Sequence, residues 1–284
     1  MKKELLKKLC CPKCRLDFKI KASSLLCMKC KSNFRVKGNI IYILPEKKEK
    51  VYWDKLYENE KAVIKSAEFF LKNKKSIPVY YNSLSVLGDK EIKSSLEIGS
   101  GTGSYSLFLK KLGLVKEVFL VDYSVNALKL AQSLFEYFNE DAVLVCADAF
   151  SLPFKDKAFD VSLSSGLVEH FNIKLQDVMV SEHCRVAKKT LIQVPYNNPV
   201  YRAYKKAYIL LTGGWPFGFE KPLKKRELKR LIIGNGMKIE RVFYHDLLTA
   251  IIFQLSKKGI LGMQTKKRFL NRFFRHEIGI LAKT

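Results

Sequence analysis

Residues 95–104 read Ser-Leu-Glu-Ile-Gly-Ser-Gly-Thr-Gly-Ser, and this stretch decides how the rest of the chain is interpreted. A short apolar run contains the carboxylate of Glu97, and three glycines then alternate with small hydroxyl residues before a helical pattern begins. The order predicts a strand, a tight turn and a helix N-terminus. Glycine suits such a turn because it adopts backbone angles barred to other residues and lets a ligand approach closely. The unpaired N–H groups of the helix would then face a polar ligand.

Apolar runs and helical patterns alternate from this stretch onward. The predicted strands are 95–98, 118–121, 143–146, 159–163, 190–194, 237–244 and 277–282, and the predicted helices are 105–112, 125–138, 175–186 and 225–233. Continuous apolar strands separated by helices indicate a parallel sheet that is covered on both faces. We therefore predict an α/β fold with a Rossmann-like, seven-stranded, mostly parallel sheet.

Two carboxylates follow the second and third predicted strands, where ligands bind in such sheets. Asp122 comes 19 residues after Gly103 and can accept both hydroxyl groups of an adenosine ribose. Asp148 can accept the adenine amino group, with Ala149 and Phe150 supplying backbone and apolar contact. NAD enzymes also use an acidic residue at the first of these positions, so Asp122 alone does not identify the cofactor. The loop spacing G-x-G-x-G, however, differs from the G-x-G-x-x-G of dinucleotide-binding loops.

Four motifs in order resemble the type 11, or UbiE-like, family of class I S-adenosylmethionine (SAM) methyltransferases. They are E-x-G-x-G-x-G at 97–103, V-D-x-S at 121–124, A-D-x-x-x-L-P-F at 147–154 and F-D-V at 159–161. The later Glu182-x-x-Arg185-Val186 also follows that family's pattern, and the resemblance covers about residues 95–196. It implies SAM as the cofactor. The residues that it implies for SAM binding are Glu97, Gly99, Ser100, Gly101, Gly103, Asp122, Tyr123, Asp148, Ala149 and Ser165.

His170 follows the fourth predicted strand, beside the expected methyl donor, and the family often places a histidine there. Its imidazole can orient or deprotonate a substrate near neutral pH, or it can simply hold the loop by a hydrogen bond. Methyl transfer from a sulfonium depends mostly on alignment, so the lack of an obvious base does not exclude it. The D/N-P-P-Y/F segment of enzymes that methylate nucleic-acid amino groups is missing at 164–167, which disfavours that reaction.

The N-terminal segment contains two C-x-x-C knuckles, Cys11 with Cys14 and Cys27 with Cys30, separated by 12 residues. This spacing predicts a structural zinc site with four thiolates. Disulfides are disfavoured because the N-terminus does not read as a secretion signal. Cys10 is a fifth thiol that can compete with Cys11, and we prefer Cys11 because it forms the C-P-x-C knuckle. The segment resembles the zinc ribbons ahead of some SAM methyltransferases, including ribosomal RNA guanine methyltransferases.

The predicted organisation is a zinc ribbon at 1–45, a helical linker or cap at 46–94 and a methyltransferase domain at 95–284. Residues 52–75 have helical apolar spacing that includes Trp53 and Tyr57, and 78–87 predict a second helix. In class I methyltransferases, helices at this place often lie over the SAM pocket, although simple core packing explains the aromatic residues equally well. The domain has insertions at about 197–222 and 246–276.

Basic residues are concentrated at both ends of the chain, which has 284 residues and a net charge of +25. Residues 1–50 contain 15 Lys and Arg against 4 Asp and Glu, and residues 197–284 contain 19 against 5, whereas residues 95–196 contain 10 against 12. Basic flanks of this kind can bind RNA, DNA or an anionic membrane surface, or their side chains can simply be exposed to solvent. No apolar stretch reaches the roughly 20 residues of a membrane span, and we expect a cytoplasmic protein.

The two insertions are expected to face the methyl acceptor, but the sequence does not identify that acceptor. The first combines a basic, tyrosine-rich helix with an aromatic loop at 213–220, which can stack bases, close over a small or lipid-like acceptor, or simply pack. The second has a basic amphipathic character that suits an anionic membrane surface. The sequence therefore predicts a SAM-dependent methyltransferase acting on RNA, a small molecule or a lipid. The alternatives are a binding module that has lost catalysis and, less favoured, an NAD-linked oxidoreductase.

Overall fold

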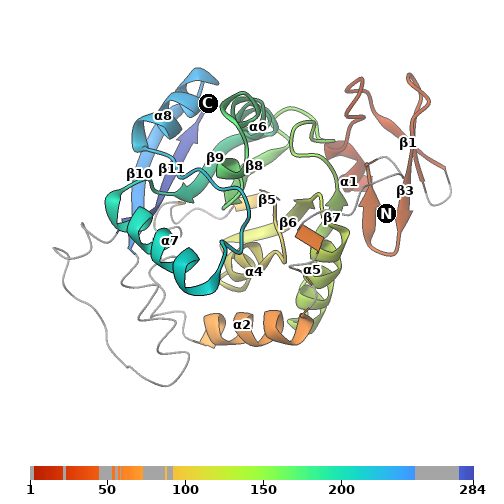
Figure 1. Ribbon diagram of the computed structural model, residues 1–284. Helices are drawn as coiled ribbons and strands as arrows, with labels where there is room; N and C mark the ends of the chain where they lie inside the picture. The colour runs from red at the N-terminus through yellow and green to blue at the C-terminus, as the bar shows by residue number, and fades with distance from the viewer. Residues whose placement is uncertain are drawn as a thin grey trace.

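The computed structural model describes residues 3–21, 24–44, 53–54, 57, 59–72, 87, 92–246 and 275–284. Seven strands form its centre in the order β7-β6-β5-β8-β9-β11-β10 (Figure 1). They are β5 (Ile92–Ile98), β6 (Val115–Asp122), β7 (Val143–Cys146), β8 (Phe159–Ser165), β9 (Ala187–Pro195), β10 (Lys238–Asp246) and β11 (Arg275–Lys283). The first five pair in parallel, and β11 is antiparallel to both β9 and β10. The predicted seven-stranded, mostly parallel sheet is confirmed.

Helices cover both faces of this sheet (Figure 1). On one face lie α4 (Ser104–Lys111) and α5 (Val125–Tyr137), with α2 (Glu60–Lys72) packed across them. On the other face lie α6 (Ile173–Val186) and α8 (Lys225–Gly234). Apolar strand residues such as Leu120 and Leu144 meet α5, and residues such as Ile192 and Ile280 meet α6 and α8, so the core has a layer on each side.

The N-terminal segment continues the central sheet, whereas a small module beside it was expected. It contains α1 (Lys3–Lys8), β1 (Phe18–Lys21), β2 (Ser24–Cys27), β3 (Asn33–Lys37) and β4 (Ile40–Tyr42). Strand β4 pairs in parallel with β7, with Ile41 opposite Val145, and Ile43 N donates to Cys146 O at 2.8 Å. The result is one sheet of eleven strands. We call residues 3–44 the ribbon from here on.

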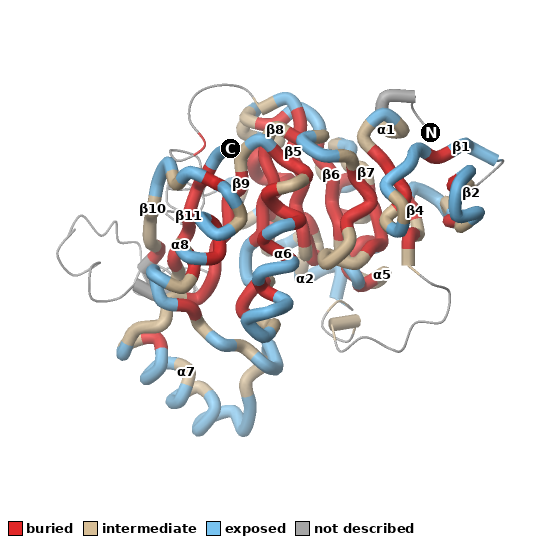
Figure 2. Tube along the Cα trace, turned by 90° about the horizontal axis from the view of Figure 1, so that it is seen from above, coloured by how far each residue is buried: buried red, intermediate tan, exposed pale blue. Residues whose placement is uncertain are grey.

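The ribbon shares its apolar core with the central sheet. Leu9, Phe34 and Ile41 are buried in the same cluster as Phe119 and Phe154, which belong to β6 and to the loop after β7. Figure 2 shows buried residues running without a break from β4 into β7. Burial of apolar surface is the main favourable term in folding, so the packing of the ribbon and of the central sheet is interdependent.

Part of the predicted organisation lies outside the described residues. The helix expected over 52–75 is observed from Glu60 to Lys72, while the helix expected over 78–87 and most of the insertion at 246–276 are not described. Among the residues that are described, no helix is both long enough and apolar enough to cross a membrane.

Candidate functional site

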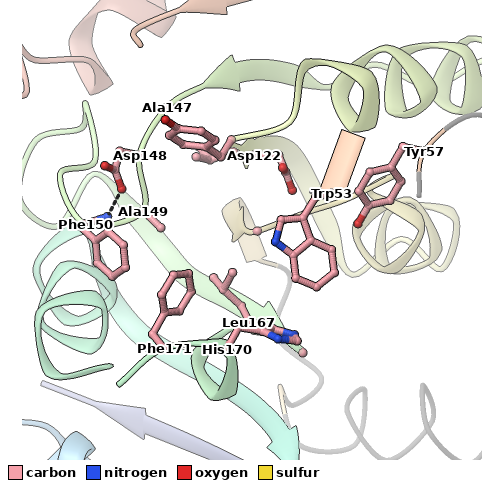
Figure 3. Close-up of a pocket in the computed structure, with 14 residues that line it drawn as sticks. Trp53, Tyr57, Asp122, Ala147, Asp148, Ala149, Phe150, Leu167, His170 and Phe171 are labelled. Atoms are coloured by element: carbon pink, nitrogen blue, oxygen red, sulfur yellow. Dashed lines mark hydrogen bonds between the residues drawn. The ribbon is translucent and has the colours of Figure 1, made fainter. Parts of the chain in front are cut away.

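A cavity of about 410 Å³ lies where β5, β6, β7 and β8 reach their carboxyl ends (Figure 3). Six of the predicted site residues line it, namely Gly99, Asp122, Tyr123, Asp148, Ala149 and His170. The other lining residues are Trp53, Tyr57, Val121, Ala147, Phe150, Gly166, Leu167 and Phe171. Glu97, Ser100, Gly101, Gly103 and Ser165 do not appear in this lining. The observed cavity therefore coincides with the edge of the sheet at which the sequence predicts ligand binding.

The glycine loop lies between β5 and α4 and leaves no room for side chains. Gly99 has a φ of +65°, and a Cβ on it would lie 2.6 Å from Leu167 Cδ1. Gly101 has a φ of +53°, and a Cβ there would lie 2.8 Å from the Tyr57 hydroxyl. Gly103 occupies the N-cap of α4, and Ser100 N donates to Val121 O at 3.0 Å. The loop needs glycine both for its left-handed backbone angles and for its close contacts.

Asp122 joins the glycine loop to the loop after β6. Its Oδ2 accepts from Gly101 N at 2.8 Å, and its Oδ1 accepts from Ser124 N at 2.7 Å. Each carboxylate oxygen can accept more than one hydrogen bond, so the group keeps acceptor capacity toward the cavity. Asp148 similarly accepts from Phe150 N at 2.9 Å, which shapes the loop after β7 (Figure 3).

A short segment before α2 covers the cavity, and sequence reasoning had left its role undecided. The Trp53 ring meets the His170 ring edge to face, with centroids 4.8 Å apart. Ser124 Oγ donates to Asp54 Oδ1, and Asn126 Nδ2 donates to Asp54 O at 3.3 Å. The sequence allows Trp53 and Tyr57 either to cover the pocket or to pack in the core, and no spacing rule distinguishes the two.

Residues 96–190 match the family model that is described as a methyltransferase domain. The similarity to this family covers about a third of the chain. No curated protein sequence matches the chain. The fold is similar to that of several solved structures, all below 20% sequence identity, so these likenesses show the fold alone.

Three of these structures illustrate the similarity. A chain from the complex between the Trm112 methyltransferase activator and a candidate methyltransferase of Haloferax volcanii has a TM-score of 0.58 and 14% identity, covering 83% of this chain and 99% of that one. A candidate methyltransferase from Bacillus halodurans C-125 has a TM-score of 0.53 and 18% identity, covering 72% and 98%. Magnesium protoporphyrin IX methyltransferase from Synechocystis PCC 6803, with bound SAH, has a TM-score of 0.52 and 15% identity, covering 81% and 92%.

Glu97 lies beneath the glycine loop, at the end of β5. Its carboxylate accepts from Ser106 N at 3.1 Å and from Ser106 Oγ at 2.5 Å, which ties β5 to α4. Burial raises the pKa of Glu97 to about 7, against the opposing effect of these hydrogen bonds. The nearby charge of Asp122 also raises the pKa.

The raised pKa of Glu97 makes stability depend on pH. The folded protein holds this proton more tightly than the unfolded chain does, so the stabilisation is present at acidic pH and is lost as pH rises toward 7. Between pH 5 and 8 the free energy of unfolding of the wild type should fall by up to about 3 kcal/mol from this group. We expect no such fall in a Glu97→Gln variant, because its side chain has no proton to lose in this range. Urea denaturation across that range measures it. Glu117→Gln, at a side chain 55% exposed, should keep the wild-type slope, and an unchanged slope in Glu97→Gln would contradict the assignment.

His170 lies at the rim of the cavity with one ring nitrogen already engaged. Its Nδ1 and Phe219 O are 2.6 Å apart, so Nδ1 carries the proton and donates to the carbonyl. In the neutral imidazole Nε2 is then an acceptor, and it lies 3.8 Å from Glu169 Oε1. Glu169 is fully buried, which raises its pKa well above the usual range, and its Oε2 has no hydrogen-bond partner among the described residues.

The four knuckle cysteines gather at one point of the ribbon. Their Sγ atoms all lie within 4.8 Å of one another, with Cys11 and Cys30 at 3.5 Å and Cys14 and Cys27 at 3.3 Å. A tetrahedral zinc with Zn–S bonds of about 2.3 Å would hold sulfur atoms about 3.8 Å apart, so the set fits that ion. Cys10 is not part of the cluster, and its backbone N donates to Pro153 O at 3.0 Å.

The first knuckle holds the loop that follows β7. Arg15 Nη1 donates to Leu152 O at 2.7 Å, and Arg15 Nη2 donates to Glu182 Oε1 at 3.3 Å. Glu182 Oε2 accepts from Leu152 N at 2.6 Å, and Arg185 Nε donates to Glu182 Oε1 at 2.6 Å. The loop that carries Asp148 is therefore fixed between the ribbon and α6.

Proposed function

We propose that the protein is a SAM-dependent methyltransferase whose cofactor occupies the cavity at the ends of β5 to β8. The supporting observation is that Asp122, Asp148 and Gly99 of the glycine loop line one cavity. Two carboxylates at the ends of neighbouring strands match the ribose and the adenine of one adenosine group. The match of residues 96–190 to the methyltransferase domain agrees with this proposal.

Each lining residue has a proposed part in holding SAM. Asp122 accepts from the ribose hydroxyls and Asp148 from the adenine amino group, with Ala149 and Phe150 against the ring. Gly99 leaves room near the sulfonium end, and Trp53 covers the cavity from above. Tyr123 also lines the cavity and is proposed to contact SAM. The other predicted residues are proposed to shape the site from the strands and loops around it, namely Glu97, Ser100, Gly101, Gly103 and Ser165.

The proposed chemistry asks mainly for alignment of the acceptor. SAM supplies an electrophilic methyl group on a sulfonium whose departure leaves a neutral thioether. His170 Nε2 is the proposed acceptor of a proton from the incoming nucleophile, because Nδ1 is held in its protonated form by Phe219 O. The Trp53 ring and the buried Glu169 carboxyl restrict the imidazole on two sides. We therefore assign His170 as the residue that orients or deprotonates the acceptor.

The four-cysteine cluster is proposed to hold a structural zinc. Four thiolates complete a tetrahedral shell and leave no open position for a substrate or a water, so this ion would not take part in methyl transfer. Its role would be to fix the ribbon, and through Arg15 the loop that carries Asp148.

Calorimetric titration of the purified protein with SAM and with NAD⁺ tests the proposed cofactor. We expect one SAM bound per chain and no heat with NAD⁺, since the loop lacks the dinucleotide spacing. Incubation with methyl-labelled SAM and fractionated extract then shows whether label enters RNA, protein, lipid or small molecules. Tight binding of NAD⁺ without SAM binding would make the proposal wrong, and SAM binding without any labelled product would favour a binding module.

A further inference from the structure

The chain after β9 forms an arm that leaves the sheet and returns to it. We call residues 199–223 the arm, which consists of α7 (Pro199–Thr212) and the loop that leads toward α8. Both ends meet at its base, where Leu223 N donates to Pro195 O and Asn197 N donates to Leu223 O, each at 3.0 Å. In Figure 2, α7 stands away from the layers of the sheet, and most of its length is exposed.

The arm is held in shape by contacts of its own. The Trp215 ring meets the rings of Tyr204 and Tyr208, with centroids 6.1 and 5.3 Å apart. Lys205 Nζ lies 4.9 Å from the centre of the same indole and donates to Glu220 Oε1 at 3.0 Å. Trp215 Nε1 donates to Glu220 Oε2 at 3.1 Å. The arm is therefore an ordered projection whose aromatic residues face one another.

The tip of the arm exposes aliphatic and aromatic side chains. Leu210 and Leu211, in the last turn of α7, are each 84% exposed. Ile209 in the same helix, and Phe217 and Phe219 in the loop that returns to the base, are exposed by 40 to 67%. A group of large apolar side chains that a folded protein leaves in water marks a surface that binds something.

Basic residues lie along the arm and at its base. Residues 199–226 contain seven Lys and Arg and one acidic residue. The exposed basic side chains are Arg202, Lys206, Lys221, Lys224, Lys225 and Arg226. Apolar side chains beside a basic surface are the combination that binds the interface of an anionic bilayer. We propose that the arm docks on an anionic phospholipid surface, with its tip inserted at the boundary of headgroups and acyl chains.

Two other occupants fit the arm less well. Single-stranded nucleic acid is held mainly by stacking on a row of open aromatic faces. In the arm, Tyr204, Tyr208 and Trp215 contact one another. Phe217 and Phe219 are exposed, but the two most exposed side chains, Leu210 and Leu211, are aliphatic. A second copy of the chain would set one basic arm against another molecule with a net charge of +25, which opposes association.

The base of the arm belongs to the rim of the candidate site. Phe219 O accepts from His170 Nδ1 at 2.6 Å, and Lys221 N donates to Glu169 O at 3.0 Å. Because Phe219 is both exposed and bonded to His170, part of the docking surface borders the proposed acceptor side of the cavity. Provided that the proposed function holds, the acceptor is a lipid or a lipid-linked molecule that SAM reaches from the interface.

Vesicle flotation with the full chain tests the docking surface. We expect binding to vesicles of phosphatidylcholine mixed with phosphatidylglycerol, and much weaker binding to phosphatidylcholine alone. A Leu211→Asp variant should bind the anionic vesicles at least about tenfold more weakly, because a carboxylate at the tip opposes both insertion and the lipid charge. Ile233→Asp is the matched control, because Ile233 is also the penultimate residue of a helix, is 58% exposed and lies outside the arm.

Calorimetry with SAM separates this inference from the proposed function. Both variants should bind SAM as the wild type does, which also shows that they are folded. Equal vesicle binding by Leu211→Asp and wild type, or no binding of the wild type to anionic vesicles at low salt, would overturn the docking surface. Loss of polyuridylate binding in Leu211→Asp, with vesicle binding unchanged, would assign the arm to RNA instead. Vesicle binding without SAM binding would leave the docking surface standing and remove the methyltransferase.

Discussion

A Cys11→Ser variant should lose the proposed zinc and unfold at a temperature at least about 10 °C lower than the wild type. The four Sγ atoms are placed for one tetrahedral ion, and three thiolates bind it far more weakly. Structural zinc contributes directly to folding free energy. In a chain of this size each lost kcal/mol lowers the midpoint by about 2–4 °C, so a loss of a few kcal/mol produces this shift. Metal analysis and scanning calorimetry measure the two effects.

Cys10→Ser is the matched control for this prediction. Cys10 is the neighbour of Cys11 and is 1% exposed, but it lies outside the four-thiol cluster. The Cys10→Ser variant should keep one zinc per chain. Its free energy of unfolding should fall only by the cost of burying a hydroxyl in place of a thiol. If instead Cys11→Ser kept its zinc and Cys10→Ser lost it, the choice of ligand would be wrong. Full stability of both variants without metal would make the structural role wrong.

An Asp122→Ala variant should bind SAM about 100-fold more weakly. The proposed ribose contact consists of two hydrogen bonds to a charged acceptor, and each contributes about 1.5 kcal/mol. Their joint loss of about 3 kcal/mol corresponds to a factor of roughly 100 in affinity. The change also removes the acceptor of Gly101 N and Ser124 N, which loosens the loops on either side. Calorimetric titration with SAM measures the affinity.

Asp141→Ala controls for the loss of a carboxylate as such. Asp141 is 82% exposed and forms a surface ion pair with Lys110, which contributes little to stability. This variant should bind SAM with wild-type affinity. SAM affinity that is equal in Asp122→Ala and wild type would count against Asp122 as the ribose acceptor, and with it against the placement of SAM in this cavity.

The central strands and helices were predictable because their signals are local. Apolar runs such as 143–146 and helical patterns such as 125–138 end within a few residues of the observed elements. The carboxylates were placed correctly at the cavity edge because strands of a parallel sheet end on one side. The positions of Asp122 and Asp148 at the edge of the sheet could therefore be predicted from local patterns and one topological rule.

The pairing of β4 with β7 and the cover by Trp53 were not predictable from the same patterns. Ile41 and Val145 are adjacent in the sheet but about a hundred residues apart in the chain, and neither strand carries a mark of its partner. Similarly, the hydrogen bonds from Arg15 to Leu152 and Glu182 depend on the final packing of the ribbon. Such contacts depend on the packing of the whole fold, and a short stretch of sequence does not specify that packing.

The pairing of β4 with β7 also protects the protein from self-association. Without residues 1–45, the outer side of β7 would present unpaired N–H and C=O groups, and Phe119 and Phe154 would lose part of their cover. An open, apolar strand edge is a template on which other chains can add, as in aggregation and amyloid. The ribbon thus replaces the edge of β7 by that of β1, a strand of four residues with two lysines, and residues 46–284 expressed alone would tend to polymerise through β7.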